Sequence, residues 1–204
     1  DAFAAASHDK AAKAQTEGRL AGEIVSIATD NGAVSTDGCI RPETTVETLS
    51  GLKPAFDENG MVTAGSSSPL TDGASAVLVC SEAYAEKANL EPLARIKGIA
   101  TAGCEPEIMG IGPVGSSNKA LARAGIGVDD LDVIELNEAF AAQSLASIRD
   151  LKLDTAKINL DGGAIALGHP LGATGARITG KAAQVLKREG GRYALASQCI
   201  GGGQ

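Results

Sequence analysis

The sequence predicts an α/β fold in which helices pack on both faces of a sheet. From Asp72 onwards, short apolar runs alternate with helical segments, many of ten or more residues, and this is the pattern of strands separated by covering helices. A chain of 204 residues suits one domain, or one domain with an appendage. Because tryptophan is absent and aromatic residues are few, the core must be built from Ala, Val, Ile and Leu.

The first third of the chain is expected to lie outside this regular pattern. Residues 1–18 predict a helix that closes at Gly18, because glycine commonly ends helices. Residues 24–28 predict a short strand. From 29 to 71 the chain is punctuated by Gly and Pro and holds few apolar residues, so we expect a loop-rich excursion from the core.

The regular alternation begins at residues 74–80, where the small, apolar run Ala-Ser-Ala-Val-Leu-Val-Cys is typical of a buried strand. Ser81 is expected to cap a helix over 81–89 whose first turn is acidic. A further helix should start near Ser116 or Ser117 and end at Gly125. The other predicted strands are 94–100, 133–136, 158–160 and 192–197, and the other predicted helices are 138–151 and 174–189, with a glycine-rich loop at 161–173.

Composition excludes several classes of function. A net charge of -7 leaves no basic stripe for nucleic acid, and no apolar run reaches the length of a bilayer. The first residues lack the pattern of a signal peptide. The four cysteines are far apart with no CxxC pair, so we expect no metal site and a reducing, cytoplasmic-type compartment; they are Cys39, Cys80, Cys104 and Cys199.

His169 is one of only two histidines and stands in a glycine-dense loop directly before a helix that Thr174 could cap. Glycine keeps an imidazole accessible, and a helix N-terminus favours developing negative charge. His169 is therefore a candidate general base or oxyanion donor. The alternative is a surface-loop histidine without a chemical role.

Cys199 and Asn137 each follow a predicted strand. Cys199 is succeeded by Ile200 and three glycines, so its thiol could lie at a strand tip beside exposed backbone N–H groups; the alternative is a buried structural cysteine. Asn137 could fix a water or a carbonyl, or it could simply cap the helix that follows it. Glu138, in the first turn of that helix, is expected to serve the helix dipole. Cys80, in the middle of an apolar run, is expected to be buried.

Three segments together resemble the C-terminal signatures of the thiolase family. They are Asn-Glu-Ala-Phe at 137–140, Gly-Gly-Ala-Ile-Ala-Leu-Gly-His-Pro at 162–170 and Cys-Ile-Gly-Gly-Gly at 199–203. Gly-Ser-Ser-Ser at 65–68, Asp-Gly-Ala at 72–74 and Leu-Lys-Pro-Ala-Phe at 52–56 also resemble that family. The likeness extends over the whole chain, which would correspond to about the second half of a complete thiolase.

The resemblance implies a role for each matching residue. His169 matches the histidine that activates a nucleophilic cysteine, and Asn137 matches the asparagine that holds a water in the same oxyanion hole. Cys199 matches the acid/base cysteine, and Gly201 matches the glycine whose N–H helps to form a second oxyanion hole. The positions that match coenzyme A contacts and its pantetheine tunnel are Arg41, Phe56, Ala64, Ser68 and Phe140.

The family likeness also implies a fold, partners and a missing group. The family fold is a five-layered αβαβα arrangement of two mixed-sheet halves, of which this chain would give one half with part of a loop domain. We expect residues 1–71 to be the C-terminal part of the loop domain and 72–204 a C-terminal thiolase domain truncated before its end. Expected partners are acyl-CoA and CoA, the N-terminal half of the same thiolase, and further copies in a dimer or tetramer.

The expected activity is reversible cleavage of 3-oxoacyl-CoA by CoA, as in fatty acid β-oxidation, or condensation of two acetyl-CoA. CoA would be a substrate, with no permanently bound cofactor. Since no cysteine here has the surroundings of the family's nucleophile, the chain alone is expected to be inactive. A relative of the ketoacyl synthases and a non-catalytic CoA- or acyl-binding subunit are the alternatives, although the presence of Asn137, His169 and Cys199 together favours catalysis.

Overall fold

The computed structural model describes all residues 1–204 and divides them into two compact units. Each unit is discontinuous in sequence, because the chain returns to unit 1 twice after first leaving it. Unit 1 consists of Asp1–Thr71, Glu138–Ser144 and Asn159–His169, and unit 2 consists of Asp72–Asn137, Leu145–Ile158 and Pro170–Gln204.

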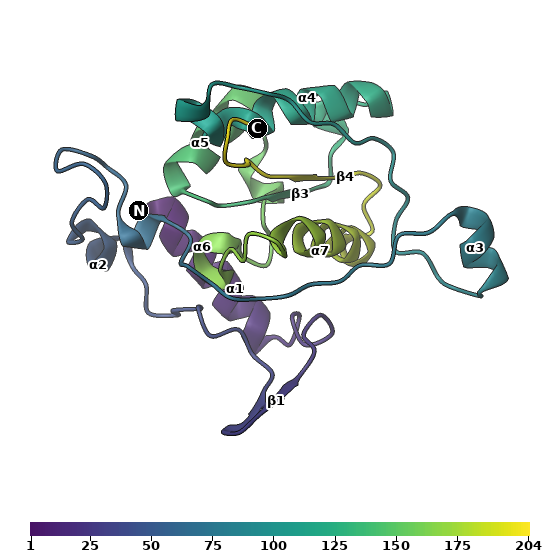
Figure 1. Cartoon of the computed structure of the whole chain (residues 1–204), viewed down its shortest axis with the longest axis horizontal. Coiled ribbons are helices and arrows are strands. Elements are labelled where there is room, and N and C mark those ends of the chain that lie inside the picture. The colour runs from purple at the N-terminus through teal and green to yellow at the C-terminus, as the bar shows by residue number, and fades with distance from the viewer. The chain divides into compact units, whose positions relative to one another are not determined.

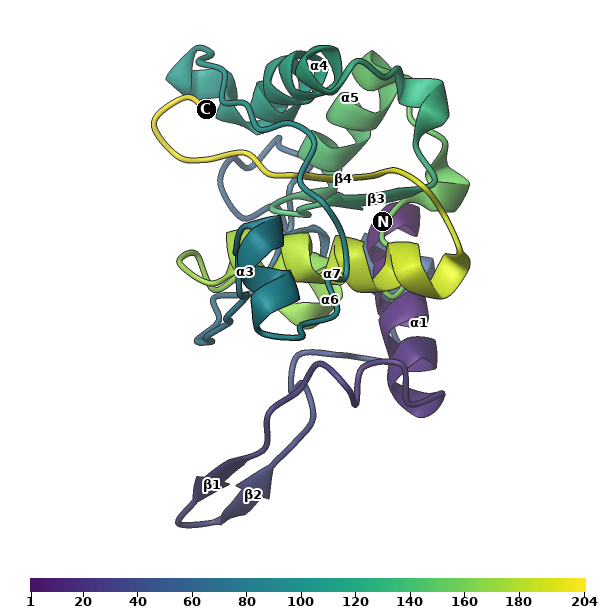
Figure 2. The same ribbon diagram turned by 90° about the vertical axis from the view of Figure 1, so that its right-hand side faces the viewer.

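Unit 2 is built around two parallel strands, β3 (Val133–Leu136) and β4 (Ala194–Ser197). Their register pairs Val133 with Ala194 and Leu136 with Ser197, and all four residues of β3 are buried. Helix α7 (Thr174–Glu189) packs on one side of the pair, and α4 (Gly112–Ala124) lies on the other (Figures 1 and 2). Coverage of both faces suits a parallel pair and confirms the predicted α/β class.

Helix positions in unit 2 follow the local signals closely. Helix α7 has the predicted bounds, and Gly190 ends it in the left-handed region at φ 67°. Ser81 caps α3 (Glu82–Lys87), accepting a hydrogen bond from the Tyr84 N–H at 3.2 Å. Helix α4 begins four residues earlier than the first predicted start, at a Gly-Pro pair, and proline suits the first turn of a helix.

The strands predicted at 74–80 and 94–100 are wrong. Neither segment forms a strand, and their apolar side chains are largely exposed; Leu78, Val79 and Ile99 are 73%, 68% and 69% exposed. The first segment runs along α7, where Ser75 donates to the Ala173 carbonyl at 2.6 Å. The second runs along α4, whose Lys119 and Arg123 donate to backbone carbonyls of Thr101 and Ile99.

The remaining strand predictions are met in part. The segment predicted at 192–197 contains β4, but 158–160 contributes only a single parallel bridge, from Ile158 to Ile134. The strand predicted at 24–28 occurs later, as β1 (Ile27–Thr29), paired with β2 (Gly32–Val34) in a hairpin. Every residue of these two short strands is exposed, and the hairpin is seen clearly in Figure 2.

Unit 1 centres on α1 (Ala2–Thr16), the helix predicted to close at Gly18, whose φ is 74°. Helix α1 packs against α6 (Ala164–Leu167) and touches α2 (Val46–Ser50). A small apolar cluster gathers side chains from four separate parts of the chain; its buried members are Ala4, Leu49, Ala141 and Ile165.

The other elements are α5 (Ala141–Leu151), which is shared by both units, and four short 3₁₀ helices. Helix α5 starts three residues later than the predicted 138, with consequences for Asn137 and Glu138. The 3₁₀ helices are Ala64–Ser66, Pro106–Ile111, Val128–Asp130 and Thr155–Lys157.

Candidate active site

The ends of β3 and β4 bring Asn137 and the Cys199 segment to the same edge of unit 2. Asn137 directly follows β3, and its N–H donates to the carbonyl of Ser197, the last residue of β4, at 2.9 Å. Cys199 stands two residues further along. Because the strands are parallel, both carboxyl ends meet at this edge, where polar groups of α/β folds commonly gather.

The alternative that Asn137 caps the following helix is wrong. Helix α5 begins at Ala141, so Asn137 stands four residues before it and cannot be its N-cap. Asn137 is only 1% exposed and continues the backbone pairing of β3 with β4. Its buried amide therefore belongs to the strand edge and not to the helix.

Cys199 is buried, as expected for a structural cysteine. It also lies just beyond the end of β4, where the reactive thiol was predicted. Burial raises the pKa of its thiol above the usual value, and the neighbouring Cys104 adds to the rise. A thiol with a raised pKa holds its proton at neutral pH. This state suits a proton donor rather than a resident thiolate nucleophile.

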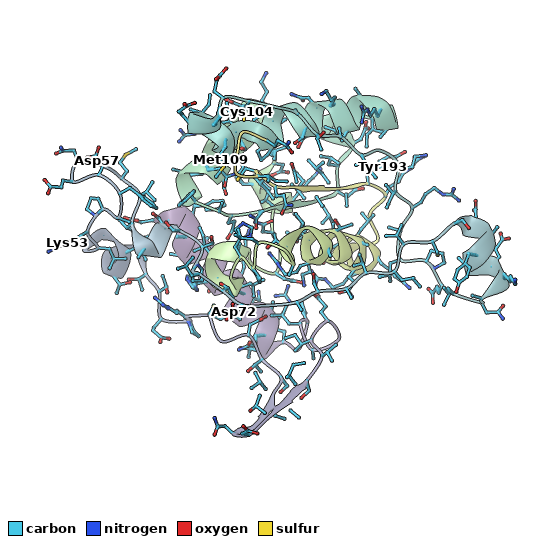
Figure 3. The ribbon with its side chains drawn as sticks, in the orientation of Figure 1. Lys53, Asp57, Asp72, Cys104, Met109 and Tyr193 are labelled. Carbon is cyan, nitrogen blue, oxygen red and sulfur yellow. The ribbon has the colours of Figure 1, made fainter.

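The segment after Cys199 is a tight turn held by backbone groups. The Ile200 N–H donates to the Gln204 carbonyl at 2.7 Å, and the Cys104 N–H donates to the Gly203 carbonyl at 2.8 Å. Cys104 lies beside Met109 on the stretch leading to α4 (Figure 3). Gly201, the predicted oxyanion residue, is exposed in this turn.

His169 belongs to unit 1 and is the last residue of its Asn159–His169 segment. It follows α6 and Gly168, is partly exposed, and its backbone N–H donates to the Thr71 hydroxyl at 3.3 Å. The predicted cap by Thr174 is wrong: Ala173 is the N-cap of α7, and Thr174 donates its hydroxyl to the Pro170 carbonyl. That His169 and Cys199 face one pocket stays a prediction.

The environment of Glu138 differs from the one predicted from the sequence. It lies outside α5 and is 2% exposed, so it serves no helix dipole there. Its carboxylate accepts hydrogen bonds from Ser7, Asn159 and the backbone of Ile165. Burial raises its pKa, while these three donors oppose the rise. Partners 21 to 131 residues away leave no local signal by which to find it.

Several predicted coenzyme A contacts lie close together in unit 1. The rings of Phe56 and Phe140 meet edge to face at 6.0 Å between centroids, with an interplanar angle of 80°. Ser68 donates its backbone N–H to the Ala139 carbonyl at 3.0 Å, which holds it beside Phe140. Ala64 opens the nearby 3₁₀ helix and is exposed.

The fifth predicted coenzyme A contact, Arg41, is held by a different residue, His8. Arg41 is exposed, and its backbone N–H donates to Nδ1 of the buried His8 at 3.1 Å. Burial lowers the pKa of His8, and the charge of Arg41 lowers it further. His8 is therefore neutral at physiological pH and fixes the backbone of Arg41, not its guanidinium.

The chain contains no cluster of three or more His, Cys, Asp or Glu side chains arranged to bind a metal ion. All four cysteines are free, and Cys80, expected to be buried, is exposed because its predicted strand does not form. None of the helices combines the length and the apolar character that crossing a bilayer would require.

Comparison with solved structures defines the class of protein. The fold superimposes on human mitochondrial 3-ketoacyl-CoA thiolase in complex with CoA at a TM-score of 0.96, with 47% identity, over 98% of this chain and 51% of that one. The acetyl-CoA acetyltransferase of Bacillus anthracis gives a TM-score of 0.94 at 45% identity, covering 98% and 52%. The fold is therefore a thiolase-like α/β fold.

Sequence comparison names the family. Residues 1–83 match the model of the thiolase N-terminal domain, and residues 90–204 match that of the thiolase C-terminal domain. The chain belongs to the thiolase family. It is 56% identical to the 3-ketoacyl-CoA thiolase of Shewanella frigidimarina and 54% identical to that of Hahella chejuensis. All of this chain aligns, and it spans about half the length of these relatives, 55% and 54%.

Proposed function

We propose that this chain provides part of the active site of a thiolase that cleaves 3-oxoacyl-CoA with CoA, reversibly, to acetyl-CoA and a shortened acyl-CoA. The observation that carries the proposal is the shared edge of β3 and β4, which gathers Asn137, Cys199 and Gly201 within one unit. Relatives named 3-ketoacyl-CoA thiolase and a neighbour solved with CoA support the choice of substrate class.

In the proposed cleavage, a cysteine thiolate from outside this chain attacks the 3-oxo carbon of the substrate. The bond between C2 and C3 then breaks, and its electron pair remains on C2. Cys199 donates a proton to C2, which releases acetyl-CoA and leaves an acyl thioester on the nucleophile. The burial that raises the pKa of Cys199 favours this step, since the thiol is protonated when the carbanion forms.

The second half of the reaction transfers the acyl group to CoA. Cys199 as thiolate accepts the proton of the CoA thiol, the CoA sulfur attacks the thioester, and the first cysteine is released. His169 activates that first cysteine and, with a water held by Asn137, stabilises one oxyanion. The Gly201 N–H donates to the other, since its exposed turn leaves this backbone accessible.

CoA is proposed to be a substrate and not a resident cofactor. The edge-to-face pair of Phe56 and Phe140 would line the pantetheine path, and Ser68, Ala64 and Arg41 would contact CoA. We further propose a loop domain over 1–71, a C-terminal domain over 72–204, assembly as a dimer or tetramer, and a cytoplasmic-type compartment.

The chain alone is proposed to be inactive, because none of its remaining cysteines suits an acyl acceptor. Cys80 is exposed in an extended segment without regular structure. The backbone N–H of Cys104 is bonded to the Gly203 carbonyl in the turn that follows Cys199. Cys39 is half-buried in the excursion between β2 and α2.

A chimera tests the proposal. This chain replaces the matching part of the Shewanella frigidimarina thiolase, and CoA-dependent loss of acetoacetyl-CoA is measured. We expect turnover by the chimera, none by the 204-residue chain, and a loss of about 100-fold or more in His169→Ala and Cys199→Ser chimeras. A folded chimera that binds CoA without turnover would instead support the non-catalytic subunit, and turnover by the isolated chain would refute the missing nucleophile.

A further inference from the structure

Glu138 is a buried acid whose oxygens are occupied by donors of unit 1. Oε2 accepts from the Ser7 hydroxyl at 2.6 Å and from the Ile165 N–H at 3.1 Å. Oε1 accepts from the Asn159 side-chain amide at 2.7 Å. With the side chain 2% exposed, the carboxylate is closed off from solvent by protein.

The Ser7 hydroxyl accepts one hydrogen bond and donates another, which fixes where its hydrogen points. The Gly163 N–H donates to the Ser7 oxygen at 3.0 Å, so this oxygen already acts as an acceptor, and its own hydrogen points to Glu138. The Glu138 carboxylate therefore holds the Gly163 N–H indirectly, by way of Ser7. It holds the Ile165 N–H directly. Two backbone N–H groups of the same short segment are thus tied to one carboxylate.

The segment needs such help because α6 is only four residues long. A single helical turn is unstable by itself, and its first N–H groups have no partner within the helix. The N-cap residue is Gly163, which has no side chain to accept from them. Glu138 takes over this role from 27 residues away, because its Oε2 accepts from the Ile165 N–H in the first turn.

The end of α6 leads directly to His169. The Gly168 N–H donates to the Ala164 carbonyl at 2.8 Å, and the next N–H, that of His169, donates to the Thr71 hydroxyl. Only three residues therefore lie between the Ile165 anchor and His169. A shift of the anchor is carried along one short turn to the histidine.

We infer that Glu138 is a positioning residue that fixes α6 and thereby sets where the His169 imidazole is held. The consequence for catalysis rests on the proposed function of His169 as activator of the nucleophile, whereas the anchoring of α6 can be tested without turnover. Glu138 itself transfers no proton in the reaction.

The test uses the 204-residue chain and NMR. It measures hydrogen exchange of the Gly163, Ile165 and His169 amides, and the titration of His169, which is readily distinguished because the chain has only two histidines. Ser7→Ala and Glu138→Gln are compared with Ser144→Ala, a control that removes an equally buried hydroxyl of unit 1 bonded only to Gln143.

We expect Ser7→Ala and Glu138→Gln to speed exchange at 163 and 165 about tenfold or more and to displace the His169 titration, since hydrogen bonds to charged groups are the stronger ones. Ser144→Ala should leave both readouts within about twofold. If the Glu138→Gln variant does not fold, the exchange rates and the His169 titration of the Ser7→Ala variant decide the test. Unchanged exchange and an unchanged His169 titration in a folded Ser7→Ala variant would overturn the inference.

The chimera separates the two proposals. Glu138→Gln there should lower kcat and displace its pH profile, with KM for acyl-CoA nearly unchanged. If the unsubstituted chimera is inactive while the exchange effects appear, the proposed function fails and the anchoring role stands. If the chimera is active and Glu138→Gln alters neither exchange nor kcat, the anchoring role fails and the function stands.

Discussion

The two loops that carry the predicted catalytic residues are held by different means. Residues 162–169 of unit 1 are fixed by side chains, with Glu138, Ser7 and Thr71 receiving their backbone N–H groups. Residues 199–204 of unit 2 are fixed by backbone, through pairing with Cys104 and within the turn itself. A buried side-chain network can be broken by changing one acceptor or by adding bulk, whereas the backbone-held turn at 199–204 has no side-chain acceptor to change and is perturbed by added bulk.

The largest expected effect comes from adding a methyl group to the side-chain network. In Gly163→Ala the new Cβ would lie 2.1 Å from the Glu138 carboxyl carbon. We expect a loss of about 3 kcal/mol in the free energy of unfolding, measured by urea denaturation, because a buried acid with three partners cannot move aside. Gly172→Ala, in open space in the loop before α7, is the control and should be nearly neutral. Equal stability of the two variants would show that the network yields.

The backbone-held turn is tested by Gly203→Ala. The added Cβ would meet the Cys104 carbonyl oxygen at 2.3 Å, and the φ of 98° disfavours any side chain. A loss of about 2 kcal/mol in unfolding free energy is expected. Gly201→Ala, two residues away with free space around it, should change stability by less than about 0.5 kcal/mol. Similar losses at both glycines would mean that the turn is not held at Cys104.

The turn at residues 199–204 should also shield the Cys199 thiol. Cys80 is exposed and Cys199 is buried with a raised pKa, so iodoacetamide at pH 8 should alkylate Cys80 at least about tenfold faster. Peptide mapping by mass spectrometry follows both sites in one sample. Gly203→Ala should speed reaction at Cys199 and leave Cys80 unaffected. Comparable rates at the two thiols in the unsubstituted chain would contradict the burial.

The smallest effect is a pH dependence of unit 1. Burial and Arg41 lower the pKa of His8, so the folded state resists a proton that the unfolded state binds below about pH 6.5. Stability should therefore fall as the pH drops through this range, with no contribution from His8 above it. Urea midpoints from pH 8 to pH 5 measure the slope, which His8→Gln should reduce. A slope that survives this substitution would assign the dependence to other groups.

Local sequence predicted those elements whose determinants are local. Helix α7 was predicted with its observed bounds, since an amphipathic run ends at a glycine. Ser81 was identified as a cap because the serine and the acidic first turn are adjacent in sequence. The strand β3 has its predicted bounds, and three of its four residues are apolar.

The failures have a common physical cause, which is the need for partners distant in sequence. Residues 74–80 are apolar enough for a strand, but a strand also needs a neighbour for its backbone groups, and these residues run beside a helix instead. Likewise, Glu138 looked like a first-turn acid, whereas its partners come from α1 and from residues 159–165.

The candidate site was predictable in part. The residue types at 137, 169 and 199 were found from short motifs, and the shared edge of Asn137 and Cys199 follows from strands that end in parallel. Nothing in those motifs indicated that the acid after Asn137 would cap a turn elsewhere. Supporting residues of this kind become visible only when the chain is folded.

The hairpin of β1 and β2 has a practical consequence. Its two strands are joined at Asp30 and Asn31, and Thr29 closes the turn by donating to the Gly32 carbonyl at 2.7 Å. Since all six strand residues face solvent, the arm buries no apolar side of its own. An epitope or a fluorescent label grafted at its tip should leave the core of unit 1 intact.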